Sequence, residues 1–109
     1  MEIRVGTVLV DFDGHALRHP DTGQLWTVGS VLYTVALGSP PPGTTYTKDE
    51  SVGRYMVGKT IYDALKHIEG TGDVNWTVDL APEIVDKLKA DIVRSFGPIV
   101  VGQIDPLLG

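Results

Sequence analysis

Residues 96–109 read FGPIVVGQIDPLLG, a largely apolar run in which Asp105 is the only charged residue. Three glycines and two prolines divide the run, and none of its side chains is suited to catalysis. A small domain with such a segment must bury it in its own core or present it to a partner, because a bare apolar run promotes aggregation. We therefore expect Ile99, Val101 and Ile104 to be buried, either in the core or in an interface.

The chain as a whole has the composition of one globular domain covering residues 1–109. Its residues are 42% hydrophobic and 21% charged, which is enough to bury a core without metal or disulfides. The net charge of −5 argues against nucleic-acid binding, which depends on clustered Lys and Arg. The absence of cysteine excludes disulfides, thiol chemistry and thiolate metal sites. No signal-peptide pattern or membrane-length apolar run occurs, so we expect a cytoplasmic protein without membrane association.

Residues 1–26 are expected to form a β-hairpin or a β-meander. Residues 2–12 are rich in valine and alternate as a strand does. Asp13 and Gly14 predict a type I′ turn, in which both central residues have positive φ. A second turn is expected at residues 21–23, which read Asp-Thr-Gly.

Residues 27–109 are expected to form three to four helices, interrupted by a proline-rich loop at residues 39–47. Thr27 is a suitable N-cap for the first helix, and Thr47 with Glu50 forms a capping-box pattern at the start of a long second helix. We expect that helix to end at Gly70. The apolar stripes that should face the core are Val28, Val31, Leu32, Val35 and Ala36 in the first helix, and Val57, Ile61, Ala64, Leu65 and Ile68 in the second.

A third helix is predicted to begin at Pro82, after Asp79 or Leu80, and to end at Gly97. Its expected core stripe is Ile84, Val85, Leu88, Ile92 and Val93, and its expected solvent face is Glu83, Asp86, Lys87, Lys89 and Asp91. Pro98 can start a last helix, and Pro106 limits it. The segment from residue 73 to residue 78 is either a short strand or an extended linker. The fold class is therefore α+β, with an N-terminal hairpin region followed by a small helical bundle.

The segment VLVDFDG, residues 8–14, resembles the first motif of haloacid dehalogenase phosphatases. In that family Asp11 would be the nucleophile and Asp13 the general acid, with magnesium neutralising the charge. The chain departs from the family at His15 and in the hairpin that follows, and 109 residues cannot hold the complete doubly wound sheet. We interpret the segment as a strand closed by an Asp-Gly turn, and we predict no catalytic residue.

His15 and His19 lie four residues apart, near the aspartates of the two predicted turns. Four-residue spacing aligns histidines only on a helix, and Pro20 argues against a helix here. We expect solvated loop histidines, and no metal or other cofactor. Trp26 and Trp76 each precede Thr-Val and a predicted helix. We expect both to pack on the core, and the alternative is a pair of exposed aromatic anchors.

The long helix carries basic residues at Arg54, Lys59 and Lys66, interrupted by acidic ones. Mixed charge of this kind is typical of a solvated helix face. Tyr55 and Tyr62 lie seven residues apart and therefore share a face. Arg54, Tyr55, Lys59 and Tyr62 are the candidate interaction residues of this helix. If the protein is a regulator, charge reversal at Arg54 and Lys59 is expected to abolish capture of the partner and to leave stability unchanged.

The order and spacing of four segments resemble a group of small, uncharacterised proteins of tailed bacteriophages and prophages. These segments are DFDG (11–14), TVGSVL (27–32), GRY with KTIYDA (53–55 and 59–64), and GPIVVGQ (97–103). The chain departs from the pattern in the proline-rich loop and at Pro106. The resemblance implies an accessory role in virion morphogenesis or during infection, in the cytoplasm of a bacterial host.

The expected function is therefore non-enzymatic protein–protein interaction in head or tail assembly. The expected partner is a phage structural protein or a host protein, and self-association is a further option. The alternative is a small infection-phase regulator that binds a host or phage enzyme or nucleic acid. An enzyme is not expected, because the residues supply no combination of nucleophile, base and oxyanion donor.

Overall fold

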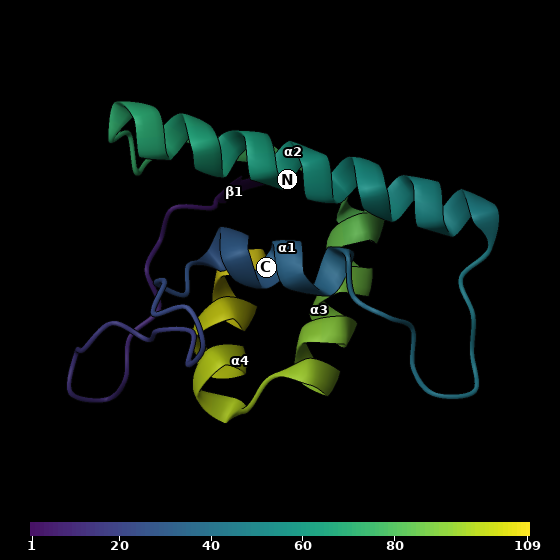
Figure 1. Ribbon diagram of the computed structural model, residues 1–109, viewed down its shortest axis with the longest axis horizontal. Coiled ribbons are helices and arrows are strands. Elements are labelled where there is room, and N and C mark those ends of the chain that lie inside the picture. The colour runs from purple at the N-terminus through teal and green to yellow at the C-terminus, as the bar shows by residue number, and fades with distance from the viewer.

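The computed structural model describes all 109 residues and has an α+β fold, as predicted (Figure 1). A two-stranded antiparallel sheet accompanies four α-helices and one 3₁₀ turn. The elements are β1 (Glu2–Arg4), α1 (Val28–Ala36), α2 (Lys48–Thr71), β2 (Thr77–Asp79), α3 (Pro82–Ser95), α4 (Pro98–Ile104) and the 3₁₀ turn η1 (Asp105–Leu108). None of the helices combines the length and the apolar character that a membrane crossing requires.

Helix α1 lies at the centre of the core. It begins at the predicted cap, because Thr27 Oγ1 accepts the Ser30 N–H at 3.0 Å and Ser30 Oγ accepts the Thr27 N–H at 2.7 Å. Six of its nine residues are buried and lie together on one broad face, which other elements cover. The buried residues are Val28, Gly29, Val31, Leu32, Val35 and Ala36.

The N-terminal segment and α2 both touch α1 at Gly29. The Gly29 N–H donates to the Val5 carbonyl at 2.8 Å, and the Val28 N–H donates to the Thr7 carbonyl at 2.9 Å. A Cβ atom at Gly29 would lie 2.7 Å from Val5 Cβ and 2.9 Å from Leu65 Cδ2. Glycine is therefore required here because of close approach by neighbouring elements.

Helix α2 is long and sparsely buried. Its 24 residues span about 36 Å at 1.5 Å per residue, and in Figure 1 it crosses the whole molecule along one edge. The predicted capping box of Thr47 and Glu50 is confirmed. The predicted stop at Gly70 is wrong, because the helix continues to Gly72, whose φ of 73° lets its N–H reach the Ile68 carbonyl at 2.7 Å. Four of its residues are buried: Val57, Gly58, Ile61 and Ala64.

The expected continuous strand over residues 2–12 is wrong, because β1 ends at Arg4. Its partner is β2, and Ile3 lies opposite Val78. The segment from residue 73 to residue 78, for which a strand and a linker were both open, therefore contributes a strand only at its C-terminal end. Strand pairing in this fold brings together two segments that are far apart in the sequence, since β1 precedes α1 and α2 and β2 follows them.

The rest of the N-terminal region forms a compact meander of three segments. The Leu9 N–H donates to the Trp26 carbonyl at 2.9 Å, the Trp26 N–H to the Leu17 carbonyl at 2.8 Å, and the Leu17 N–H to the Leu9 carbonyl at 2.9 Å. These three hydrogen bonds close a ring. The two predicted turns are present, with positive φ at Gly14 and Gly23. The first is not a type I′ turn, because Asp13 has no positive φ.

Helix α3 begins at Pro82 as predicted, although its cap residue is Ala81 rather than Asp79 or Leu80. Val85, Leu88 and Ile92 are buried in the core. Two predictions about this helix are wrong. Val93, which was expected in the core, is 61% exposed, and Asp91, which was expected on the solvent face, is 5% exposed. Asp91 follows Ile84 by seven residues and Leu88 by three, so it lies on the inward face.

The apolar C-terminal run lies in the core of the same chain. Val100, Ile104 and Leu108 are buried, and Ile99 and Val101 are half-buried against the core. Trp26 also packs on the core, edge to face with Phe96 at 5.4 Å. The same prediction for Trp76 is wrong, because its ring stacks on His67 at 3.9 Å and the residue remains 43% exposed.

Replacing Gly29 with Ala is expected to destabilise the fold by about 2 kcal/mol, since the added methyl group overpacks the contact with Val5 and Leu65. Gly53→Ala is the matched control. Gly53 lies inside α2 with no atom near its would-be Cβ, so alanine there should stabilise by about 0.5–1 kcal/mol. Urea unfolding of both variants measures the difference, and equal effects would contradict the close approach at Gly29.

The capping box should be visible in a pH titration. The Thr47 N–H donates to Glu50 Oε1 at 3.2 Å. This hydrogen bond is the main reason why the pKa of Glu50 is below 4.5, and a hydrogen bond with the Thr47 side chain is the second. Because the pKa of Glu50 is lower in the folded state than in the unfolded state, the unfolded state takes up the proton first as the pH falls below 4.5. The stabilisation is therefore present above pH 4.5 and is lost as the pH falls through the folded pKa.

The measurement is the carboxyl chemical shift of Glu50 by NMR. Thr47→Ala should return its midpoint toward 4.5, whereas Thr60→Ala, at an exposed threonine of the same helix, should leave the midpoint unchanged. A midpoint at 4.5 in the wild-type chain would show that the capping box does not form in solution.

Candidate functional site

The structure separates the predicted interaction residues into three places. Tyr55, Lys59 and Tyr62 line one groove on α2. Arg54 faces the other side of that helix and is engaged by α3. Ile99, Val101 and Ile104 lie on α4, with Ile104 in the core and the other two packed against it.

The groove on α2, here called the tyrosine groove, lies where the end of α1 meets the middle of α2. Its volume is about 300 Å³. Its walls are Tyr33, Leu37, Tyr55, Gly58, Lys59, Tyr62 and Asp63. The lining is therefore mainly aromatic and aliphatic, and it carries one cation, one carboxylate and the tyrosine hydroxyl groups.

Close contact between the two helices shapes this groove. Leu37 lies directly over Gly58, since a Cβ atom at Gly58 would come within 2.7 Å of Leu37 Cδ2. The rings of Tyr33 and Tyr62 lie 6.2 Å apart, in the range of a favourable aromatic pair. Leu37, Tyr55 and Tyr62 nevertheless stay 46%, 59% and 46% exposed. The groove is thus built by packing and is left open to solvent.

The charged groups of the groove have weak partners. Lys59 lies 3.4 Å from Asp63, and Lys66, whose ammonium lies 5.5 Å from the Tyr62 ring centre, is 3.1 Å from Glu69. The hydrogen bond from Lys66 to Glu69 raises the pKa of Lys66, so its charge is retained. Exposed pairs of this kind contribute little to stability, so the lysines can exchange these carboxylates for others.

Sequence reasoning missed Tyr33 and Leu37. Neither belongs to the apolar stripe predicted for α1, and neither was singled out as an interaction residue. A signal was available in their four-residue spacing, which places them on one face, away from Val31 and Val35.

Arg54 has a structural position between three elements. Its Nη2 lies 2.8 Å from Asp91 Oδ2, its Nη1 donates to the Val35 carbonyl at 3.2 Å, and its guanidinium lies 4.4 Å from the centre of the Tyr46 ring. Asp91 also pairs with Arg94 at 3.0 Å. The Arg54 side chain is 18% exposed and that of Asp91 8%, so this charge pair is inside the protein. Charge reversal at Arg54 would therefore disturb the fold, contrary to the expectation from sequence.

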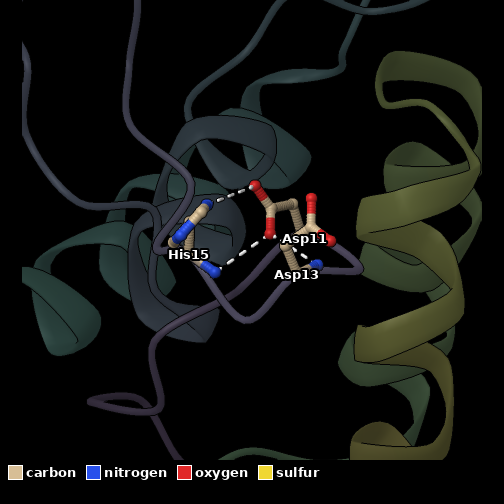
Figure 2. A group of neighbouring side chains, drawn as sticks. All are labelled: Asp11, Asp13 and His15. Atoms are coloured by element: carbon tan, nitrogen blue, oxygen red, sulfur yellow. Dashed lines mark hydrogen bonds and ion pairs between the residues drawn. The ribbon is translucent and has the colours of Figure 1, made fainter.

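The Asp11-Phe12-Asp13-Gly14 hairpin gathers two carboxylates and a histidine (Figure 2). Asp11 Oδ1 accepts the N–H groups of Asp13 and His15, both at 2.9 Å, and Asp11 Oδ2 lies 3.7 Å from His15 Nδ1. The carboxylate of Asp11 therefore closes the turn, which accounts for its spacing from Asp13. His19 is not part of this group, because its ring packs on Trp26 at 5.3 Å.

Phe12 lies at the tip of this hairpin and is 97% exposed, although the sequence placed it inside a strand. The hairpin is fastened to α4 by one side chain. Gln103 Oε1 accepts the Val10 N–H at 2.9 Å, and Gln103 Nε2 donates to the Val10 carbonyl at 2.6 Å. A broad hollow of about 820 Å³ separates the tip from Pro98 and Gly102 of α4. Phe12 is thus presented from a fixed position.

Removal of Arg54 should be costly. Arg54→Ala leaves Asp91 buried with Arg94 as its remaining partner, and is expected to cost about 3 kcal/mol. The control Lys59→Ala breaks an exposed pair and should cost less than about 0.5 kcal/mol. The double variant Arg54→Met/Asp91→Leu should recover most of the loss, because apolar side chains can replace a buried pair. Thermal and urea unfolding test this, and equal losses for Arg54→Ala and Lys59→Ala would refute it.

Comparison with protein-family models, with curated proteins and with solved structures finds no match for this chain.

Proposed function

We propose that this chain is a non-enzymatic accessory protein of a tailed bacteriophage or prophage, which acts by protein–protein contact in head or tail assembly. The observation that carries the contact role is the tyrosine groove, an open aromatic depression on a folded helix pair. The assignment to phage rests on the resemblance in four segments of the sequence, including residues 27–32 and 97–103.

The exposed side of α2 has the composition of an interface. Val52, Tyr55, Met56 and Tyr62 are between 46% and 59% exposed, and they follow one another at helical spacing. Tyrosine and methionine are enriched in protein interfaces, and tyrosine is frequent among the residues that dominate binding energy. A helix of this length with four buried residues leaves most of its surface exposed, which supports a role in binding.

A non-catalytic role is supported by the engagement of the hairpin acid. Asp11 has a histidine at 3.7 Å, which is the closest approach to an acid–base pair in this region. Its carboxylate already accepts two backbone N–H groups, and these hold the turn. The Asp11 carboxylate therefore stabilises the backbone of the hairpin turn.

A second candidate is an infection-phase regulator that binds a host or phage enzyme or nucleic acid. The observation in its favour is the interleaving of Lys59 and Lys66 with Tyr55 and Tyr62 on one exposed helix face. Tyrosine rings can stack on bases, and lysines can approach phosphates. The net charge of −5 opposes the nucleic-acid form of this candidate.

Site-specific photo-crosslinking tests the proposed function. A photoreactive amino acid at Tyr55 should yield a crosslink to a head or tail protein in phage-producing bacteria. The same group at Val93, which is equally exposed on α3, should not. Crosslinks to an enzyme or to nucleic acid would support the regulator instead. The absence of any crosslink that is specific to Tyr55 would exclude the groove as the contact surface.

A further inference from the structure

We propose that the hollow between the hairpin tip and α4 receives an arginine side chain from a basic segment of a partner protein. This hollow, here called the hairpin hollow, has a volume of about 820 Å³. It shares no lining residue with the tyrosine groove. The inference therefore names a second contact surface, which stands or falls independently of the first.

The hairpin hollow has an aromatic wall and a negative charge. Phe12 lines it on the hairpin side, and residues of α4 line it on the other. Asp11 is the only charged residue among those that line the hollow. The amide of Gln103, the other polar side chain of the lining, is already engaged with Val10. The lining thus carries one negative charge and no positive charge.

A second carboxylate strengthens this charge at the tip of the hairpin. Asp13 is exposed, and one of its carboxylate oxygens lies within 4.8 Å of one from Asp11. The basic residue of this group is His15, whose Nδ1 lies 3.7 Å from Asp11 Oδ2, and Figure 2 shows its ring on the opposite side of Asp11 from α4. Even a protonated His15 offsets one of the two carboxylates, so the tip remains negative.

This combination favours a cation over a purely apolar group. Phe12 is 97% exposed and lies between the two aspartates in the sequence. An apolar group packed on its ring would remove water from the neighbouring carboxylates without replacing their hydrogen bonds, which is unfavourable. A cation gains from the face of the ring and from the carboxylates together. The net charge of −5 also attracts a basic partner to the chain.

Among cations, the geometry favours a guanidinium group. Its plane can cover the Phe12 ring while its N–H groups reach Asp11 Oδ2 and Asp13, whereas the compact ammonium of lysine has no plane to stack. A metal ion would gain nothing from the aromatic ring, and Asp11 Oδ1 already accepts two backbone N–H groups. These hydrogen bonds also hold the tip in place before binding, which lowers the entropic cost.

The test is an NMR titration of the ¹⁵N-labelled chain with the peptide acetyl-Gly-Arg-Gly-amide. The peptide should shift the amide signals of Phe12, Asp13 and Gly102, with a Kd on the order of 10 mM. The same peptide with citrulline, which keeps the shape of arginine without its charge, should bind about five-fold more weakly. The peptide with lysine should bind about three-fold more weakly than the arginine peptide.

Variants of the chain add a second readout. Phe12→Leu and Asp13→Asn should each weaken binding of the arginine peptide about three-fold. Both side chains are exposed, so the melting temperature should not change. Gly102→Leu should weaken binding to a similar extent, because no atom lies near the added Cβ and the side chain can fill the hollow. Asp86→Asn, which removes the same charge from an exposed position of α3, is the control and should leave binding unchanged.

Three results would overturn the proposal. The first is equal binding of the arginine and citrulline peptides, and the second is wild-type affinity in the Phe12 and Asp13 variants. The third is a shift of the same signals by Mg²⁺ or Zn²⁺ at a lower concentration than the peptide requires, which would assign the hairpin to a metal ion. Crosslinking from Tyr55 is unaffected by any of these, so the proposed function is tested separately.

Discussion

The burial of α1 is the constraint on which the other elements depend. A helix of nine residues with six buried and no charged side chain must be enclosed by other elements. Helix α2 covers one side, α3 another, and the N-terminal segment reaches its first turn through Val5 and Thr7. Gly29 allows these neighbours to approach without a side chain between them. Val100, Ile104 and Leu108 of the apolar C-terminal run belong to the same hydrophobic core, so this segment is core of its own chain.

Helix α2 has two sides with different tasks. Its inner side holds the fold, through apolar residues and through Arg54, which joins α3 by Asp91 and the end of α1 by the Val35 carbonyl. Its outer side makes few internal contacts, and the aromatic residues of the tyrosine groove are set there. Exposed residues of the groove, such as Tyr55 and Lys59, can therefore change with little effect on the core, whereas Arg54, one position before Tyr55, cannot.

Local signals predicted the helices well, because caps and prolines act over a few residues. Thr27, Thr47 and Pro82 each begin a helix as expected. The partner of β1 could not be predicted, since Val78 lies 75 residues after Ile3 and only the intact fold brings them together. Asp91 was placed wrongly because its charge outweighed its helical spacing.

The candidate site was predictable in part. The seven-residue spacing of Tyr55 and Tyr62 placed them on one face, and the structure brings Lys59 beside them. Tyr33 and Leu37 come from another helix, so their arrival at the groove depends on tertiary packing. Phe12 was assigned to a strand because alternation in sequence does not show where a turn begins. Its exposure follows from the Asp11 carboxylate, which closes the turn around it.

The contact between Gln103 and Val10 has a consequence for solubility. A side-chain amide that both accepts from and donates to one backbone residue occupies the positions that a neighbouring β-strand would use. The edge of the hairpin is therefore closed to strand addition at Val10, which removes one position where edge-to-edge pairing could begin. One glutamine thus protects the backbone edge two residues before the exposed Phe12.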